Sequence, residues 1–135
     1  MMRNSRKLQR GSAMVEAALA STTALALLFG IFEFGQAVWQ YNLVAHAVRE
    51  GTRYAVVHGA NSKTPATTDT ITAVVKRQSL GLDPSKLTVA VTWLPNNKPG
   101  SAVKVALSYP ITFMGPYVPN GNYTVKSTSQ MVIEN

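Results

Sequence analysis

The stretch SAMVEAALASTTALALLFGIF, residues 12–32, decides how this chain is built. Glu16 is its only ionisable residue. A helix of about 20 residues, rising about 1.5 Å per residue, spans roughly 30 Å, which is the thickness of the hydrocarbon layer of a bilayer. We therefore expect residues 12–34 to form a transmembrane helix.

Basic residues crowd the segment before this apolar stretch. Residues 1–11 contain Arg3, Arg6, Lys7 and Arg10, and the next Lys or Arg is Arg49. Positive charges keep a flank on the cytoplasmic side of a membrane. We expect residues 1–11 to be a basic cytoplasmic leader and the part after the helix to be exported.

An ordinary secretory signal is the first alternative for this segment. The pattern AALAS offers a small-residue cleavage site at Ala18 to Ala20. Glu16 would interrupt the apolar stretch before that site, however, and the most apolar residues follow it. Cleavage there would leave them at the mature N-terminus, so we favour a retained helix.

Small side chains recur at helical spacing in the same stretch. Small residues let transmembrane helices approach each other closely. The alternative is that they only fill a single span, but we expect them to pack against other membrane helices. The set consists of Ala13, Ala17, Ala20, Ser21 and Ala24.

The helical pattern continues beyond the apolar stretch through residues 35–58. No proline occurs before Pro65, and the pattern becomes amphipathic. We expect this continuation to lie outside the membrane and to pack its apolar face on a soluble head. The apolar face is predicted to carry Ala37, Tyr41, Val44, Val48 and Ala55. The polar face is predicted to carry Asn42, His46, Arg49 and Arg53.

Residues 59–135 predict a small extracytoplasmic head with one helix and three strands. Thr68–Leu80 has helical spacing, with Ile71, Val74 and Val75 on one face and Gly81 as its stop. Apolar and polar residues alternate over 87–94 and 102–109, as in half-buried strands, and 123–134 is predicted to supply the third strand. Pro110, Pro116 and Pro119 predict an irregular stretch before the third strand.

The predicted fold class is therefore α+β: a long N-terminal transmembrane helix packed on a small head. The head would combine a three-stranded antiparallel sheet with the second helix.

Composition disfavours several classes of function. The net charge of +7 could favour nucleic acid, but the basic residues after the leader are scattered and form no clustered face. The chain has no cysteine, which excludes disulfides and thiolate zinc sites. Its two histidines are isolated, and no phosphate loop or nucleophile elbow occurs. We expect no catalytic, metal or cofactor site and no nucleic-acid partner.

The segments RGSAMVEAALA (10–20) and LLFGIFEFGQAVWQYNLVAHAVREGTRYA (27–55) resemble the start of TadE-like pseudopilins. These are minor pilins of tight-adherence (Flp-type) pilus systems. The resemblance rests on a glycine followed five residues later by glutamate, on FGIFEFG and on REGxRYA. It implies a pilin-like fold, a location in the bacterial inner membrane and no enzymatic activity.

The resemblance also implies a maturation step and partners. A prepilin peptidase would cut between Gly11 and Ser12, leaving an α-ammonium on Ser12. The partners would be this peptidase, other pilin and pseudopilin subunits, an assembly platform with its ATPase, and membrane lipid.

Glu16 is the feature that most needs an explanation. A carboxylate inside a spanning segment costs up to several kcal/mol and is by default a functional residue. One alternative is that Glu16 lies at the inner interface and reaches water. We instead expect Glu16 to pair with the Ser12 ammonium of a neighbouring subunit, because opposite charges attract strongly in low dielectric.

These inferences predict a minor pilin that acts in the assembly or priming of a tight-adherence pilus. The main alternative is an uncleaved single-pass membrane protein whose exported head binds a ligand or an envelope component. A secreted enzyme with a removed signal is a more distant alternative.

Overall fold

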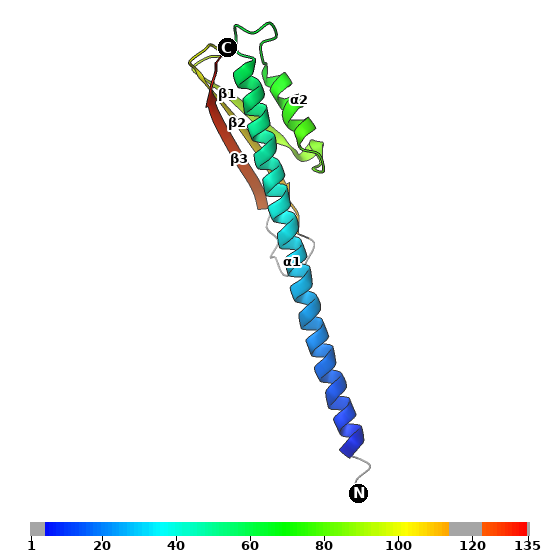
Figure 1. The fold of residues 1–135 in the computed structure, drawn as a ribbon. Coiled ribbons are helices and arrows are strands. Elements are labelled where there is room, and N and C mark those ends of the chain that lie inside the picture. Colours follow the sequence, from blue (N-terminus) through cyan, green and yellow to red (C-terminus); the bar gives the residue numbers. More distant parts are fainter. Residues whose placement is uncertain (1–4, 114–122, 135) are drawn as a thin grey trace. The chain divides into compact units, whose positions relative to one another are not determined.

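A computed structural model describes residues 5–113 and 123–134 of the chain, and side chains from Gly11 onward. The described residues form two helices, a short 3₁₀ turn and three strands, which is the α+β arrangement that the sequence predicts (Figure 1). In chain order these are α1 (Ser5–Val57), α2 (Thr68–Gln78), η1 (Pro84–Lys86), β1 (Thr88–Leu94), β2 (Ala102–Ile111) and β3 (Tyr123–Val132).

The chain divides into two compact units. Among the described residues, the first comprises 5–35 and Phe113, and the second comprises Gln36–Thr112 and 123–134. Helix α1 therefore contributes its N-terminal part to the first unit and its C-terminal part to the second. The second unit also contains α2 and the sheet, and we call it the head.

Helix α1 begins earlier than the apolar stretch. Its 53 residues start at Ser5, whereas the apolar pattern alone predicts a start near Ala13. The leader contains arginine, lysine, leucine and glutamine, which are good helix formers, and no proline. The helix therefore extends through the leader, and Gly11 lies inside it.

The sheet is a simple antiparallel meander with strand order β1-β2-β3. In its middle, Val91 pairs with Val105, and Val105 pairs with Ser129. Alternate residues of β2 are buried from Val103 to Ile111. The predicted alternation in the first two strands and the hairpin between them are confirmed.

The expectation that Pro110 begins an irregular stretch is wrong. Pro110 lies within β2 and is paired with Thr124 of β3. The pairing of β1 with β2 stops at Ser108, so β2 has a neighbour on only one side at Pro110. Proline is tolerated where a strand has a free edge, because its missing N–H then costs no ladder hydrogen bond. Pro116 and Pro119 lie outside the described residues.

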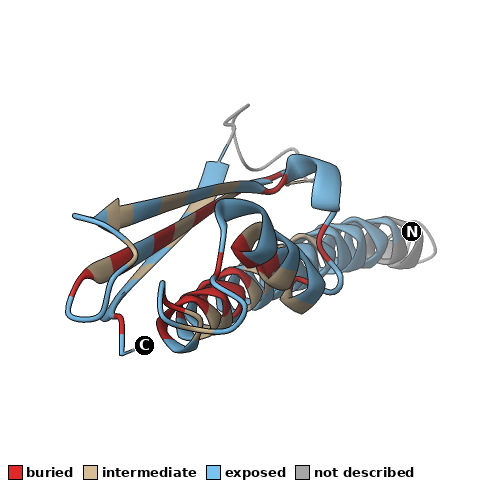
Figure 2. Cartoon of the chain, turned by 90° about the horizontal axis from the view of Figure 1, so that it is seen from above, coloured by how far each residue is buried: buried red, intermediate tan, exposed pale blue. Residues whose placement is uncertain are grey.

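Both helices of the head lie against the same face of the sheet, and the buried residues lie between the two layers (Figure 2). On α1 the predicted apolar residues Val44, Val48 and Ala55 are fully buried. The predicted polar residues Asn42, His46, Arg49 and Arg53 are exposed. The predicted packing of the C-terminal part of α1 against α2 and the sheet is therefore confirmed.

Tyr41 is a wrong prediction on this face, because its side chain is 52% exposed. Among the described residues of α1, burial begins at Val44. The helical period correctly places Tyr41 on the face, but the head meets this turn of the helix through Trp39, whose ring lies against Gly81, and leaves Tyr41 uncovered.

Helix α2 has clear boundary signals. Thr67 is its N-cap and forms a capping box with Thr70, in which each side chain accepts from the other residue's backbone N–H. The helix ends at Gln78, and Gly81 follows with φ +97°, in the left-handed region that favours glycine. Ile71 and Val75 are buried and Val74 is half-buried, as predicted.

Candidate assembly site on the N-terminal helix

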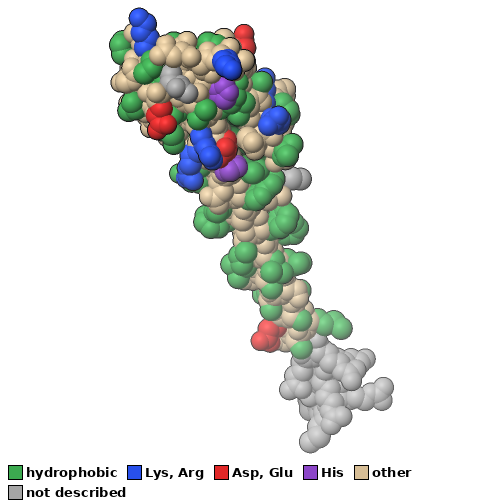
Figure 3. Space-filling view, turned by 45° about the horizontal axis from the view of Figure 1, so that its top comes forward, with side chains coloured by type: hydrophobic (Ala, Val, Ile, Leu, Met, Phe, Trp, Pro, Cys, Tyr) green, Lys and Arg blue, Asp and Glu red, His purple; other side chains and the backbone are tan. Residues whose placement is uncertain are grey.

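The N-terminal part of α1 exposes an unusually apolar surface. The helix is long and apolar enough to cross a membrane, with a mean hydropathy of 1.8 over its most apolar window and none of that window buried. Figure 3 shows hydrophobic side chains along this part of the helix, while most described Lys and Arg side chains lie on the head. Such exposure suits a lipid or protein-covered environment rather than water.

The polar hydroxyls of this segment are satisfied within the helix. Thr22 Oγ1 donates to the Ala18 carbonyl oxygen at 2.8 Å, and Thr23 Oγ1 donates to the Leu19 carbonyl oxygen at 2.9 Å. Internal hydrogen bonds of this kind allow threonine to lie in hydrocarbon without an unpaired donor.

The three residues predicted for maturation and charge pairing lie on one stretch of helix. Gly11, Ser12 and Glu16 are all helical and exposed. Within residues 11–113 and 123–134, Glu16 has no hydrogen-bond or ion-pair partner. Its carboxylate is thus available to a group from outside the described chain.

The other predicted site residues fall into two groups. Arg3 lies outside the described residues, and Arg6, Lys7 and Arg10 are in α1 with side chains that the structure does not describe. The predicted small packing residues are all exposed, so they are available for contact; these are Ala13, Ala17, Ala20, Ser21 and Ala24.

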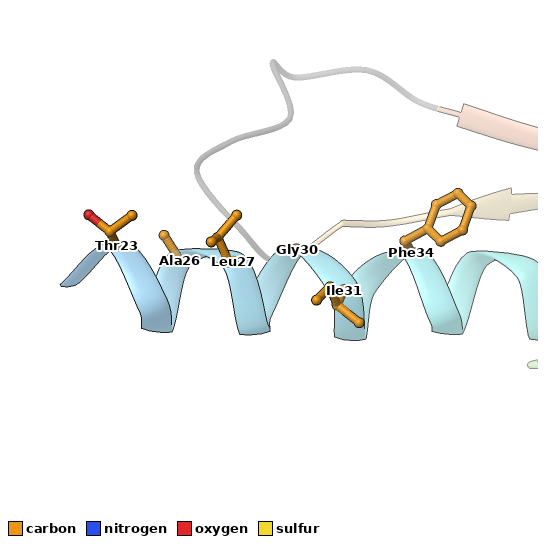
Figure 4. A pocket seen from close by; sticks show the side chains of 6 residues that line it. All are labelled: Thr23, Ala26, Leu27, Gly30, Ile31 and Phe34. Atoms are coloured by element: carbon orange, nitrogen blue, oxygen red, sulfur yellow. The ribbon is translucent and has the colours of Figure 1, made fainter. Parts of the chain in front are cut away.

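A hollow of about 510 Å³ lies on a nearby part of the helix. Figure 4 shows its lining along the helix, with Thr23, Ala26, Leu27 and Phe34 on the same side as the exposed backbone of Gly30. We call this surface the hollow, and it is lined by Thr23, Ala26, Leu27, Gly30, Ile31 and Phe34.

Sequence reasoning missed the hollow because it followed only the small residues. The signal that would have found it is a row of small residues at seven-residue spacing next to a row of large residues with the same spacing. Thr23 and Gly30 form one such row, and Leu27 and Phe34 form the row beside it.

A second hollow, of about 470 Å³, lies on the head between α1 and α2. Its lining mixes charged and apolar groups: Glu50, Arg53, Tyr54, Val57, His58, Val74, Arg77 and Gln78. His58 stacks on Tyr54 with ring centroids 4.1 Å apart. Its Nδ1 lies 2.9 Å from the Tyr54 carbonyl oxygen, which can only accept, so Nδ1 carries the proton.

The two histidines of the chain differ in their surroundings. His46 is exposed, but His58 is half-buried by this stacking. Among the described residues, no group of three or more His, Cys, Asp or Glu side chains lies close enough to hold a metal ion.

Fold and site together define a class of protein: a small α+β head continuous with an apolar helix that can span a membrane. Residues 11–53 match the model of a family described as TadE-like protein. The resemblance drawn from the sequence is therefore confirmed over this part of the chain. The match begins at Gly11 and ends before α2 and the sheet. No curated protein and no solved structure matches the chain.

Proposed function

We propose that this protein is a minor pilin that acts in the assembly or priming of a tight-adherence pilus. The observation that carries the proposal is the family match over residues 11–53. It includes the predicted cleavage residue, Glu16 and the whole apolar segment. The role is structural: the helix supplies membrane retention and packing, and the head contacts partner subunits.

Maturation consists of a cut between Gly11 and Ser12 by a membrane-embedded aspartic prepilin peptidase. The four basic residues of the leader hold the site on the cytoplasmic face, and the head is exported. Because Gly11 lies within α1, the peptidase must unwind the helix locally to obtain an extended backbone. Glycine lowers the cost of this step, since it is about 1 kcal/mol less favourable than alanine inside a helix.

The cut creates a positively charged group that can pair with the Glu16 carboxylate. The new Ser12 ammonium lies at the membrane's inner edge, and Glu16 is the fifth residue of the mature chain. Within one chain these groups are one helical turn apart. Between neighbouring subunits, the ammonium of one compensates the carboxylate of the other and offsets its desolvation.

The proposed location is the bacterial inner membrane, with a single pass, a cytoplasmic N-terminus and an extracytoplasmic head. The partners are the peptidase, other pilin and pseudopilin subunits, the assembly platform and lipid. Incorporation into the extracellular pilus would remove the helix from lipid and cover it with the helices of other subunits.

The mature N-terminus tests this proposal directly. Mass spectrometry is applied to the protein from cells with and without the candidate prepilin peptidase. We expect a peptide that begins at Ser12 only where the peptidase is present. A Gly11→Leu variant should retain its leader in both strains, because a bulky side chain blocks a site that accepts glycine.

Two other results would contradict the proposal. A peptide beginning at Ser21 would mean ordinary signal cleavage after Ala20. A leader that stays intact in both strains would support the uncleaved single-pass membrane protein with a binding head.

A further inference from the structure

The loop between α2 and η1 reaches back to the part of α1 at which the head begins. A Cβ atom built at Gly81 would lie 2.7 Å from Trp39 Cη2 and 3.3 Å from Trp39 Cζ2, so the ring of Trp39 lies against the backbone of Gly81. The φ of +97° at Gly81 and its missing side chain both allow this contact. The loop is therefore held at the level of Trp39.

Large side chains are exposed around this contact. Leu80 is 77% exposed, and Trp39 keeps 50% of its surface exposed although its ring packs on Gly81. Tyr123, the first residue of β3, is 47% exposed. We call the three exposed residues Trp39, Leu80 and Tyr123 the rim.

Strand β3 places Tyr123 at the same end of the head as Trp39. The other end of β3 lies at the C-terminal end of α1, where the Glu134 backbone N donates to the Val56 carbonyl oxygen at 3.4 Å. From Val132 back to Tyr123 the strand covers about 30 Å, and from Val56 back to Trp39 the helix covers about 26 Å. Figure 1 shows β3 beside this part of α1, so the two elements reach the same end of the head.

The expected transmembrane segment ends just before the rim. Helix α1 continues without a break from Phe34 to Trp39, which corresponds to a rise of about 7.5 Å. The hydrocarbon core of a bilayer is about 30 Å thick and the whole bilayer about 40–45 Å, so each headgroup layer is roughly 5–7 Å thick. Side chains on a helix lean toward its N-terminus, which brings the Trp39 ring back into this layer. Trp and Tyr side chains are enriched at that height.

Positive charge surrounds the loop of the rim. Lys76, Arg77 and Lys86 are exposed, and Asp83 is the only acidic residue among residues 76–86. Three basic residues minus one acidic residue give this segment a net charge of +2. Such a charge is attracted to anionic headgroups, and an exposed leucine beside it can insert between them.

We propose that the rim docks on the outer surface of the membrane that α1 spans, with Leu80 inserted among the lipid headgroups. The inference rests on the proposed location, because a bilayer lies beside the rim only if α1 crosses it. Lipid is the occupant that the continuous helix brings to this height in every copy, whatever other subunits are present. The three rim residues come from α1, the loop and β3, so docking holds the head in one orientation on the membrane.

Single-site labelling of the full chain can test this docking, because the native chain has no cysteine. Leu80→Cys marks the rim. Leu94→Cys marks an exposed apolar position at the opposite end of the head, where β1 pairs with Ala102. Each variant carries the environment-sensitive fluorophore NBD and is reconstituted at one chain per nanodisc of phosphatidylethanolamine and phosphatidylglycerol. Lipids with a nitroxide at the headgroup then quench a label that lies in the headgroup layer.

We expect these lipids to quench the Leu80 label severalfold more strongly than the Leu94 label in discs that hold one chain. Equal quenching of the two labels would overturn the proposal. A blue shift of the Leu80 label that appears only when a disc holds two or more chains would overturn it in favour of contact with a second copy.

The packing of Trp39 on Gly81 provides a matched pair of variants. Trp39→Ala removes the ring that holds the loop, whereas Val38→Ala shortens a neighbouring exposed side chain. We expect quenching of the Leu80 label to fall severalfold with Trp39→Ala and to stay unchanged with Val38→Ala. Equal effects would contradict the role of Trp39 in placing the loop. If Trp39→Ala fails to fold, the comparison of the Leu80 and Leu94 labels still decides the proposal.

A third label separates this inference from the proposed location. Ala24→Cys marks the apolar part of α1 and is read with lipids that carry the nitroxide deep in the acyl chain. Quenching at Ala24 without quenching at Leu80 would refute the docking and leave the membrane location standing. No quenching at Ala24 would refute the location and the docking with it.

Discussion

At the scale of single residues, the glycines of α1 show how one residue type serves different purposes. Gly30 and Gly35 have open space around the position of a Cβ atom. At Gly51 a Cβ atom would lie 2.5 Å from Val75 Cγ2 and 3.6 Å from Ile71 Cγ2. Gly51 thus lets α1 and α2 approach closely. The low helix propensity of glycine at this position is offset by the packing of the two helices.

We predict that Gly51→Leu lowers the free energy of unfolding of the head by about 2 kcal/mol or more, because overpacking a rigid valine typically costs ~1–3 kcal/mol. Thermal unfolding of the detergent-solubilised chain, followed by circular dichroism, measures the change. Gly35→Leu is the control and should leave the transition in place. An unchanged transition for Gly51→Leu would show that the two helices are not in contact at this position.

At the scale of elements, the short turn η1 shows how a local hydrogen-bond pattern sets a charge. Asp83 is its N-cap, and its Oδ1 accepts from the Ser85 backbone N at 3.0 Å and from Ser85 Oγ at 2.7 Å. The hydrogen bond from the Ser85 side chain lowers the pKa of Asp83 below its ordinary value of 3.8 and has the largest effect. The hydrogen bond from the Ser85 backbone and the nearby charge of Lys86 lower it further. The turn positions the chain between α2 and β1.

The lowered pKa predicts a pH-dependent contribution to stability. A carboxylate whose pKa is lower in the folded state stabilises the fold above its unfolded pKa, and this contribution is lost as the pH falls through the folded pKa. Wild type should therefore melt at a higher temperature than Asp83→Asn at neutral pH. The difference should shrink as the pH falls below 3.8.

Ser85→Ala provides the control for this pH series. It removes the side-chain hydrogen bond to Asp83. At neutral pH, the difference in melting temperature between Ser85→Ala and Ser85→Ala/Asp83→Asn should therefore be smaller than the difference between wild type and Asp83→Asn. A difference between wild type and Asp83→Asn that does not change with pH would contradict the assignment.

At the scale of the whole molecule, the two compact units differ in how far their apolar side chains are buried. The buried core lies within the head, where α1, α2 and the sheet contribute to one cluster. The most apolar part of α1, by contrast, has no buried residues. Changes in the two units should therefore have separable effects.

We predict that Glu16→Gln abolishes piliation but shifts the unfolding free energy of the head by less than about 0.5 kcal/mol, because distant sites without shared partners act independently. Glutamine keeps the shape of the side chain and removes its charge. Pilus counts by electron microscopy and melting of the purified chain measure the two effects. Asp69→Asn removes a carboxylate from the exposed first turn of α2 and serves as the control.

Two results would count against this separation. Normal piliation in Glu16→Gln would show that the charge has no assembly role. A large loss of head stability in the same variant would show that Glu16 acts on folding instead.

The sequence by itself determined the features that depend on local pattern. The apolar run from Ser12 to Phe32 required a helix that can span a membrane, and period-two alternation placed Val103, Val105 and Leu107 on the buried face of a strand. Both follow from neighbours along the chain, because backbone hydrogen bonding and side-chain direction repeat with a fixed period.

Only the tertiary structure decided where those patterns meet other parts of the molecule. Tyr41 fits the apolar period of α1 yet stays exposed, because the head packs on this turn of the helix at Trp39 and leaves the side of Tyr41 uncovered. Pro110 lies in a strand because its partner on one side has already ended. The hollow was found where small and large side chains stand side by side around the helix. Burial and shape depend on which distant segments approach one another, and no local period contains that information.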